Sequence, residues 1–169
     1  HTERTRESLD IILNQWKHVD VPFTYKGKFW DINIPDPKDY AFADLRHHIT
    51  PFQKPHPPIG VAGGSPGSET LKIVGERGYI PMSLGLNAVY VASHWDVVTK
   101  GADSAGRQPP SRSEWRIVRD IWVADSDEEA RETARGYIAK FFELQADHYE
   151  ADADHWKDIE GYKQFSKTF

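Results

Sequence analysis

The stretch that decides the fold of this chain reads PPIGVAGGSPGSE, residues 57–69. Its first half is short, apolar and preceded by prolines, which is typical of a buried strand. Its second half consists of Gly, Ser and Pro, and a helical pattern follows it. Ser65 is a suitable N-cap and Pro66 suits the first turn of a helix. The pattern therefore predicts a strand over 58–63 and a helix from about Pro66 to Arg77.

This turn is a candidate anion site. Where a strand is followed by small residues and then by the N-terminus of a helix, several backbone N–H groups are unpaired and point to one place. Such a place attracts an anion, most often a phosphate. Gly63, Gly64 and Gly67 would let a ligand approach the backbone. The alternative is an ordinary capped turn. The stretch lacks a P-loop lysine and the glycine spacing of a dinucleotide-binding motif, so it predicts neither.

Composition restricts the class of protein. The chain has 169 residues, 38% of them hydrophobic, which is enough for one domain with a core, and we expect residues 1–169 to form a single α/β domain. A net charge of −5 without a basic cluster argues against nucleic acid as a partner. We expect no membrane partner, no signal peptide and a cytoplasmic location. The absence of cysteine excludes disulfides and zinc sites built on cysteine.

The segments before residue 57 are predicted from their patterns. Apolar residues at helical spacing predict an amphipathic helix over 3–17. Aromatic residues around Lys26-Gly27 predict a small hairpin within 21–30. Residues 33–57 read as a long connection. Its histidines have no further ligand at a suitable spacing, so we predict no metal site.

Further strands and helices follow the opening strand. A second short strand is predicted over 79–84. Met82 lies toward its carboxyl end, where ligands gather in α/β proteins, and plain core packing is the alternative for this residue. A weaker helix is predicted over 87–104 and a third strand over 115–123.

The last long helix is predicted over about 127–147, with Ser126 and Glu129 as a capping box. The alternation of strands and helices predicts βαβ units and a parallel sheet. Three strands do not close an eight-stranded barrel, which needs about 250 residues. The pattern therefore leaves a small open α/β protein or part of a larger barrel. The predicted buried stripe of the last helix consists of Ala130, Ala134, Tyr137, Ile138, Phe141, Phe142 and Leu144.

Several motifs occur in an order and spacing that resemble one protein family. They are RESLDIIL (6–13), FTYKGKFW (23–30), PFQKPHPPI (51–59), SPGS (65–68), GERG (75–78) and the strand and capped helix of 116–134. Together they resemble the luciferase-like flavin monooxygenases, near the limonene-monooxygenase and alkanal-monooxygenase branch. The resemblance covers most of residues 3–150.

The resemblance implies a (β/α)8 TIM barrel, of which this chain would hold only the middle-to-late part, about strands five to seven. It implies a monooxygenase that uses reduced FMN and O2 to oxygenate a small organic substrate. A separate NAD(P)H-dependent flavin reductase would deliver the reduced FMN. The resemblance also implies a homodimer and a mobile lid over the active site, which falls on residues 151–169.

The family's phosphate-contacting segment falls on Gly64, Ser65 and Ser68, and its contact to the isoalloxazine falls near Met82. The early barrel strands, which carry the family's usual active-site contacts, have no counterpart here, so no catalytic residue is assigned. Three alternatives stay open. They are a deazaflavin-dependent oxidoreductase of the same barrel family, a non-catalytic flavin-binding barrel relative, and a lyase or isomerase that binds a phosphate ligand on a similar barrel. The sequence does not identify the substrate.

Overall fold

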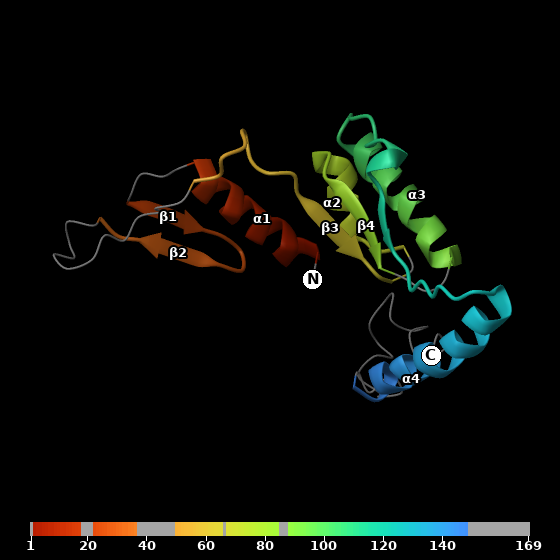
Figure 1. Cartoon of the computed structure of the whole chain (residues 1–169). Coiled ribbons are helices and arrows are strands. Elements are labelled where there is room, and N and C mark those ends of the chain that lie inside the picture. Colours follow the sequence, from red (N-terminus) through yellow and green to blue (C-terminus); the bar gives the residue numbers. More distant parts are fainter. Residues whose placement is uncertain (1, 18–21, 37–49, 66, 85–87, 149–169) are drawn as a thin grey trace. The chain divides into compact units, whose positions relative to one another are not determined.

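The structure is a computed structural model that describes residues 2–17, 22–36, 50–65, 67–84 and 88–148 (Figure 1). The chain divides into two compact units, His1–Ile59 and Gly60–Phe169, and each is described by itself. Whether residues 1–169 act as a single domain stays a prediction. Within the described ranges, every helix is too short or too polar to serve as a membrane span.

The first unit contains a helix and an antiparallel hairpin. Helix α1 spans Thr2–Lys17 and confirms the predicted amphipathic helix. Strands β1 (Phe23–Lys26) and β2 (Asp31–Ile34) pair antiparallel. The predicted hairpin therefore exists, but its second strand lies beyond residue 30. Strand β2 also takes the first residues of the predicted connection over 33–57, of which residues 37–49 lie outside the described part.

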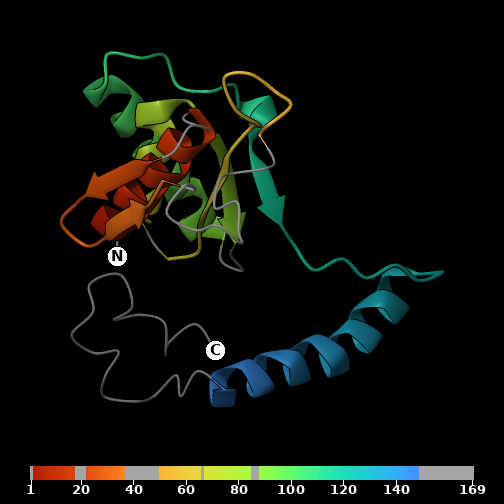
Figure 2. The ribbon, with the colours of Figure 1, turned by 90° about the vertical axis from the view of Figure 1, so that its left-hand side faces the viewer.

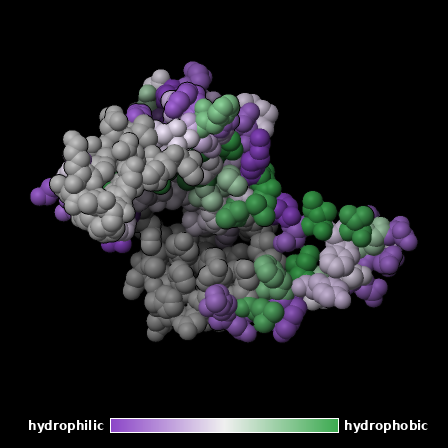
Figure 3. Space-filling view, turned by 60° about the vertical axis from the view of Figure 1, so that its left-hand side comes forward, coloured by the Kyte–Doolittle hydropathy of each residue, from purple (hydrophilic) through white to green (hydrophobic). Residues whose placement is uncertain are grey.

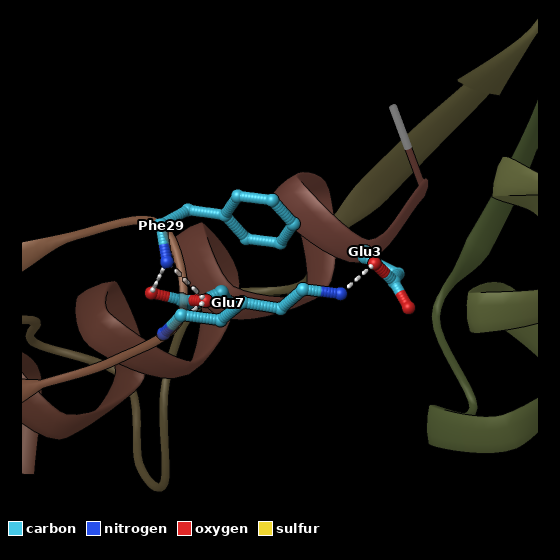
Figure 4. Close-up of polar contacts among 4 residues, drawn as sticks. Glu3, Glu7 and Phe29 are labelled. Atoms are coloured by element: carbon cyan, nitrogen blue, oxygen red, sulfur yellow. Dashed lines mark hydrogen bonds and ion pairs between the residues drawn. The ribbon is translucent and has the colours of Figure 1, made fainter.

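A carboxylate from α1 holds the turn of this hairpin. Glu7 is buried, and its two carboxylate oxygens accept the backbone N–H groups of Lys28, Phe29 and Trp30 at 2.9–3.1 Å. Figure 4 shows the bonds between Glu7 and the N–H of Phe29. The ammonium group of Lys28 pairs with Glu3 at 2.7 Å, and this hydrogen bond lowers the pKa of the Glu3 carboxyl. The turn's backbone donors are satisfied by Glu7, which explains why an ionisable side chain is buried at this position.

The second unit is built on three parallel strands. They are β3 (Gly60–Gly63), β4 (Ile80–Leu84) and β5 (Arg116–Val118), and they lie side by side in this order. This arrangement confirms the predicted parallel sheet. The first and third strands are shorter than predicted, since the sequence pattern extends them to 58–63 and 115–123.

Two helices pack on one face of β3 and β4 (Figure 1). They are α2 (Thr70–Arg77) and α3 (Ala88–Ser104), and α3 confirms the helix predicted over 87–104. Gly78 ends α2 in the left-handed conformation, with φ +70°, as a glycine at this position predicts. The buried apolar side chains of the two helices form the core, and they are Leu71, Ile73, Val74, Val91, Val98 and Ala102.

The start of α2 corrects one prediction. The sequence predicts Ser65 as N-cap and Pro66 in the first turn, but α2 begins at Thr70, and its N-cap Glu69 makes no side-chain capping bond. Gly67 has φ +57°, a left-handed conformation that a continuous α-helix does not allow. The residues before Thr70 therefore form a loop. Pro66 itself lies outside the described residues.

Helix α4 (Asp127–His148) confirms the last predicted helix, and an extended segment separates it from β5 (Figure 2). The hydroxyl of Ser126 accepts the backbone N–H of Glu129 at 3.2 Å, which confirms the capping of this helix by Ser126.

The predicted buried stripe of α4 is wrong for the described side chains. Tyr137, Phe141 and Leu144 are 67%, 50% and 56% exposed. Trp122 stacks on Tyr137 with ring centroids 5.4 Å apart, but it covers only part of that ring. Exposed apolar residues also appear as green patches on the surface in Figure 3. Helical periodicity identifies the apolar face of a helix, but it does not show what covers that face. The other predicted members of the stripe are half-buried (Ala130, Ala134, Ile138), or their side chain lies outside the description (Phe142).

Candidate anion-binding site after strand β3

The residues predicted to bind a cofactor lie toward the carboxyl ends of β3 and β4. Gly64, Ser65 and Ser68 belong to the connection between β3 and α2, which we call loop 64–69. A Cβ built on Gly64 would lie 3.4 Å from the carbonyl oxygen of Leu84, so the loop begins beside the end of β4. Because β3 and β4 are parallel, their carboxyl ends meet at one edge of the sheet, where α/β proteins bind ligands.

Met82 lies on a different face of the sheet from Ser68. It is half-buried and alternates along β4 with two buried residues, Pro81 and Ser83, and Ser83 contacts His94 of α3. A Cβ built on Gly63, which is buried on the helix-covered face, would lie 2.8 Å from the Cβ of Ser68. The structure therefore brings Gly64, Ser65 and Ser68 together at the loop, and it places Met82 on the face that the two helices leave uncovered.

The start of α2 offers backbone donors to a ligand. Leu71 and Lys72 donate their N–H groups to the carbonyls of Ser68 and Glu69. No described residue accepts a hydrogen bond from the N–H groups of Ser68, Glu69 or Thr70. Donors at a helix start point outward from the helix and carry a partial positive charge, so they favour an anion.

The two serine hydroxyls of loop 64–69 differ in what they can donate. No described residue forms a hydrogen bond with the hydroxyl of Ser65, which is half-buried. The hydroxyl of Thr70 donates to the carbonyl of Ala62 at 2.8 Å, and its oxygen lies 3.1 Å from that of Ser68. Because Thr70 has one hydroxyl proton and gives it to Ala62, Ser68 must be the donor to Thr70. Ser68 therefore offers a ligand its backbone N–H, whereas Ser65 can offer its hydroxyl.

A set of buried and partly buried hydrogen bonds joins this loop to α3, β4 and the residue before β5. His94 is 1% exposed, and its Nε2 lies 2.8 Å from the carbonyl oxygen of Ser65. Its Nδ1 lies 3.0 Å from the hydroxyl of Ser83, which also accepts the indole N–H of Trp115 at 2.8 Å. The carbonyl of Ser65 can only accept, so Nε2 carries the proton, and in the neutral imidazole Nδ1 accepts from Ser83. We call these four residues the His94 network.

His94 and Ser93 hold the loop but are absent from the sequence-based predictions. The backbone N–H of Gly67 donates to the hydroxyl of Ser93 at 3.2 Å, so adjacent residues of α3 contact the loop at two points. One signal for His94 is present in the sequence. It lies three residues after Val91 and four before Val98, on the apolar face of the predicted helix, where a polar side chain needs a partner.

Other predicted features lie elsewhere or outside the description. The Nδ1 atom of His56 lies 2.7 Å from the carbonyl oxygen of Pro57, whereas His47 and His48 are outside the described residues. The described ranges contain no group of three His, Cys, Asp or Glu side chains that could hold a metal ion. Residues 151–169, the predicted lid, are also outside the description.

Comparison with known proteins finds relatives among the diketocamphane monooxygenases. The 3,6-diketocamphane 1,6-monooxygenase of Pseudomonas putida is 34% identical over 134 residues, which is 76% of this chain and 34% of that protein. The 2,5-diketocamphane 1,2-monooxygenase 1 of the same organism is 33% identical over 135 residues, which is 79% of this chain and 36% of that protein. The chain thus spans about a third of the length of these curated relatives.

A solved structure agrees with these sequence relatives. It is the oxygenating constituent of 3,6-diketocamphane monooxygenase from Pseudomonas putida in complex with FMN, described as a type II Baeyer-Villiger monooxygenase. Its TM-score is 0.62 at 27% identity, and the match covers 96% of this chain and 42% of that chain. The sequence profile of the luciferase-like monooxygenases matches residues 1–167. The resemblance in the sequence motifs is therefore confirmed, and this chain belongs to the luciferase-like monooxygenase family.

Proposed function

We propose that this chain provides the FMN phosphate site of a flavin-dependent monooxygenase, which uses reduced FMN and O2 to oxygenate a small organic ketone. Membership of the luciferase-like family and the FMN complex of the similar structure support the cofactor. The observation that carries the proposal is the set of donors at the start of α2. The N–H groups of Ser68, Glu69 and Thr70 are without an acceptor among the described residues, and they follow directly on the loop that contains Ser65.

The residues of the loop fit the chemistry of a phosphate group. A phosphate monoester presents three oxygens that accept hydrogen bonds. Loop 64–69 and the first residue of α2 together offer three N–H groups, and Ser65 offers its hydroxyl. Among the described residues beyond its chain neighbours, none lies within 4 Å of a Cβ built on Gly67, so they leave room beside its backbone. Each charge-assisted hydrogen bond of this kind contributes about 1.5–3 kcal/mol.

We also propose that the three parallel strands belong to a (β/α)8 barrel, at about strands five to seven. Strands β3, β4 and β5 are adjacent in chain order, as in a barrel wall, and α2 and α3 cover one face of the first two. In a barrel the uncovered face would be the interior. Met82 would then face the interior, in a position to contact the flavin ring.

The role of this chain in the reaction is binding and orientation. Reduced FMN would supply two electrons, so that one atom of O2 enters the substrate and the other leaves as water. For a ketone, the inserted oxygen would lie between the carbonyl carbon and its neighbour, giving an ester or a lactone, as the Baeyer-Villiger description of the similar structure suggests. By holding the phosphate, loop 64–69 would fix one end of the cofactor at the carboxyl edge of the sheet.

The partners follow from the same relatives. The similar structure is described as the oxygenating constituent of its enzyme, which supports a separate flavin reductase as the source of reduced FMN. A homodimer stays a prediction.

The test uses the full-length protein with reduced FMN, O2 and a bicyclic diketone of the camphane type. We expect O2 consumption that depends on the ketone, and a product heavier by one oxygen atom in mass spectrometry. Flavin binding without ketone-dependent O2 consumption would support a non-catalytic relative instead. Hydride transfer with a deazaflavin coenzyme, without O2 consumption, would support the oxidoreductase alternative, and absence of any flavin affinity would support a lyase or isomerase.

A further inference from the structure

We propose that His94 is a positioning residue for the cofactor phosphate, because its hydrogen bond to the Ser65 carbonyl sets the orientation of loop 64–69 toward the ligand. This inference rests on the proposed function of the loop. His94 would not touch the ligand. It would act through Ser65, whose carbonyl accepts the Nε2–H of His94 at 2.8 Å.

The direction of the Ser65 carbonyl matters to an anion. A peptide group has a positive end at N–H and a negative end at C=O, so a phosphate site must present N–H groups and turn carbonyls away. His94 is buried, and it draws the carbonyl of Ser65 toward the protein interior. The carbonyl oxygen is therefore held away from the solvent side of the loop, where an anion would approach.

The loop depends on α3 for its conformation. Gly67 is in the left-handed region, and no described residue beyond its chain neighbours would lie within 4 Å of an added Cβ, so packing by the described side chains does not hold this part of the loop. Its N–H donates to the hydroxyl of Ser93, which in turn donates to the carbonyl of Tyr90 at 2.6 Å. Ser93 and His94 together give the loop two anchors on one helix, and His94 holds the residue whose hydroxyl can donate to the phosphate.

Ser83 and Trp115 fix the tautomer that this role requires. The indole N–H of Trp115 donates to the hydroxyl oxygen of Ser83, and the Ser83 proton is then directed at Nδ1 of His94. With Nδ1 as acceptor, the imidazole proton must lie on Nε2, which faces Ser65. The ring of Trp115 is itself packed against Trp95 of α3, with centroids 5.2 Å apart.

The experiment separates a positioning role from a structural one by comparing two flavins. FMN and riboflavin differ by the phosphate alone, so the ratio of their dissociation constants measures the contribution of the phosphate site. We would titrate the full-length protein with each flavin and follow the quenching of flavin fluorescence. The variants are His94→Leu, which removes the donor, and His94→Gln, whose amide can still donate to Ser65. Asp96→Asn, at an exposed position on the same helix, is the matched control.

The wild-type protein should bind FMN more tightly than riboflavin. We expect His94→Leu to weaken FMN binding about tenfold, the effect of losing roughly one well-oriented hydrogen bond, with little change for riboflavin. His94→Gln should restore most of the preference for FMN, and Asp96→Asn should leave it unchanged. If His94→Leu weakened the binding of FMN and of riboflavin equally, the role of His94 would be merely structural and the inference would be overturned. An unchanged ratio of the two dissociation constants would overturn it as well.

Two further outcomes are distinguishable. A wild-type protein without preference for FMN over riboflavin would contradict the proposed phosphate site itself, not only the role of His94. If thermal unfolding shows that His94→Leu is not folded, Ser83→Ala takes its place, because it removes the group that fixes the tautomer. Ser83→Ala should lower the preference for FMN, and an unchanged preference in that variant would overturn the inference.

Discussion

Gly75 of α2 and Gly101 of α3 lie backbone against backbone, and a Cβ built on Gly75 would lie 3.0 Å from the carbonyl carbon of Gly101. A Cβ on Gly101 would in turn meet the carbonyl of Lys72 on α2. Both glycines are buried. The absence of two side chains therefore allows α2 and α3 to approach closely, and this contact helps to set where α3 presents His94 to loop 64–69.

Alanine at either glycine should destabilise the protein. We expect Gly75→Ala and Gly101→Ala to lower the free energy of unfolding by about 1–3 kcal/mol each, because the new methyl group meets backbone that cannot move aside. Urea denaturation followed by tryptophan fluorescence measures the change. Gly136→Ala on α4 is the control, since a Cβ built there would meet no other described part of the chain within 4 Å, and it should stabilise by up to about 1 kcal/mol. A similar change in all three variants would contradict the close contact.

Loss of the Glu7 carboxylate should loosen the β1–β2 turn. In Glu7→Gln one acceptor oxygen becomes an NH2 donor facing the N–H groups of Lys28, Phe29 and Trp30, so we expect a loss of about 1–3 kcal/mol. Hydrogen exchange of these three amides, compared with the wild-type protein, measures the effect. Glu3→Gln should change it far less, because the Glu3–Lys28 pair is exposed and screened by solvent. Equal effects of the two substitutions would contradict the role of Glu7.

The two serines of loop 64–69 should contribute unequally to FMN binding. Ser65→Ala removes a hydroxyl that forms no hydrogen bond with any described residue, and we expect the substitution to weaken FMN binding about tenfold. Ser68→Ala should have a smaller effect, because the Ser68 hydroxyl donates to Thr70 and its backbone N–H survives the substitution. Isothermal titration with FMN checks both variants. A larger effect of Ser68→Ala than of Ser65→Ala would reverse this assignment.

Local sequence signals predict the three parallel strands, though not all of their bounds, and most helix ends. They fail where a contact between residues far apart in the sequence decides the conformation. Gly78 ends α2 as predicted, because a left-handed C-terminal glycine is encoded locally. Ser65 and Pro66 also match a local helix-start pattern, yet the helix begins at Thr70. There, the carbonyl of Ser65 and the N–H of Gly67 bond to His94 and Ser93 of α3, 29 and 26 residues away, and these contacts hold the segment as a loop.

The candidate site also has a part that local sequence signals predict and a part that depends on contacts between distant residues. Glycine and serine after a short apolar strand locate loop 64–69 from the sequence alone. The His94 network that holds this loop could not be predicted from the sequence. Its partners are far apart in the chain, since His94 lies 29 residues from Ser65 and Trp115 lies 32 residues from Ser83. The apolar face of α4 shows a further limit. Its periodicity is correct, but the described residues leave Tyr137 and Leu144 exposed.

The most direct measurement is a crystal structure of the full-length protein with FMN bound. We predict that the phosphate oxygens lie about 2.7–3.2 Å from the hydroxyl of Ser65 and from the backbone nitrogens at the start of α2, Ser68 to Thr70. A phosphate bound elsewhere, with these N–H groups facing only solvent, would contradict the assignment of loop 64–69 as the phosphate site.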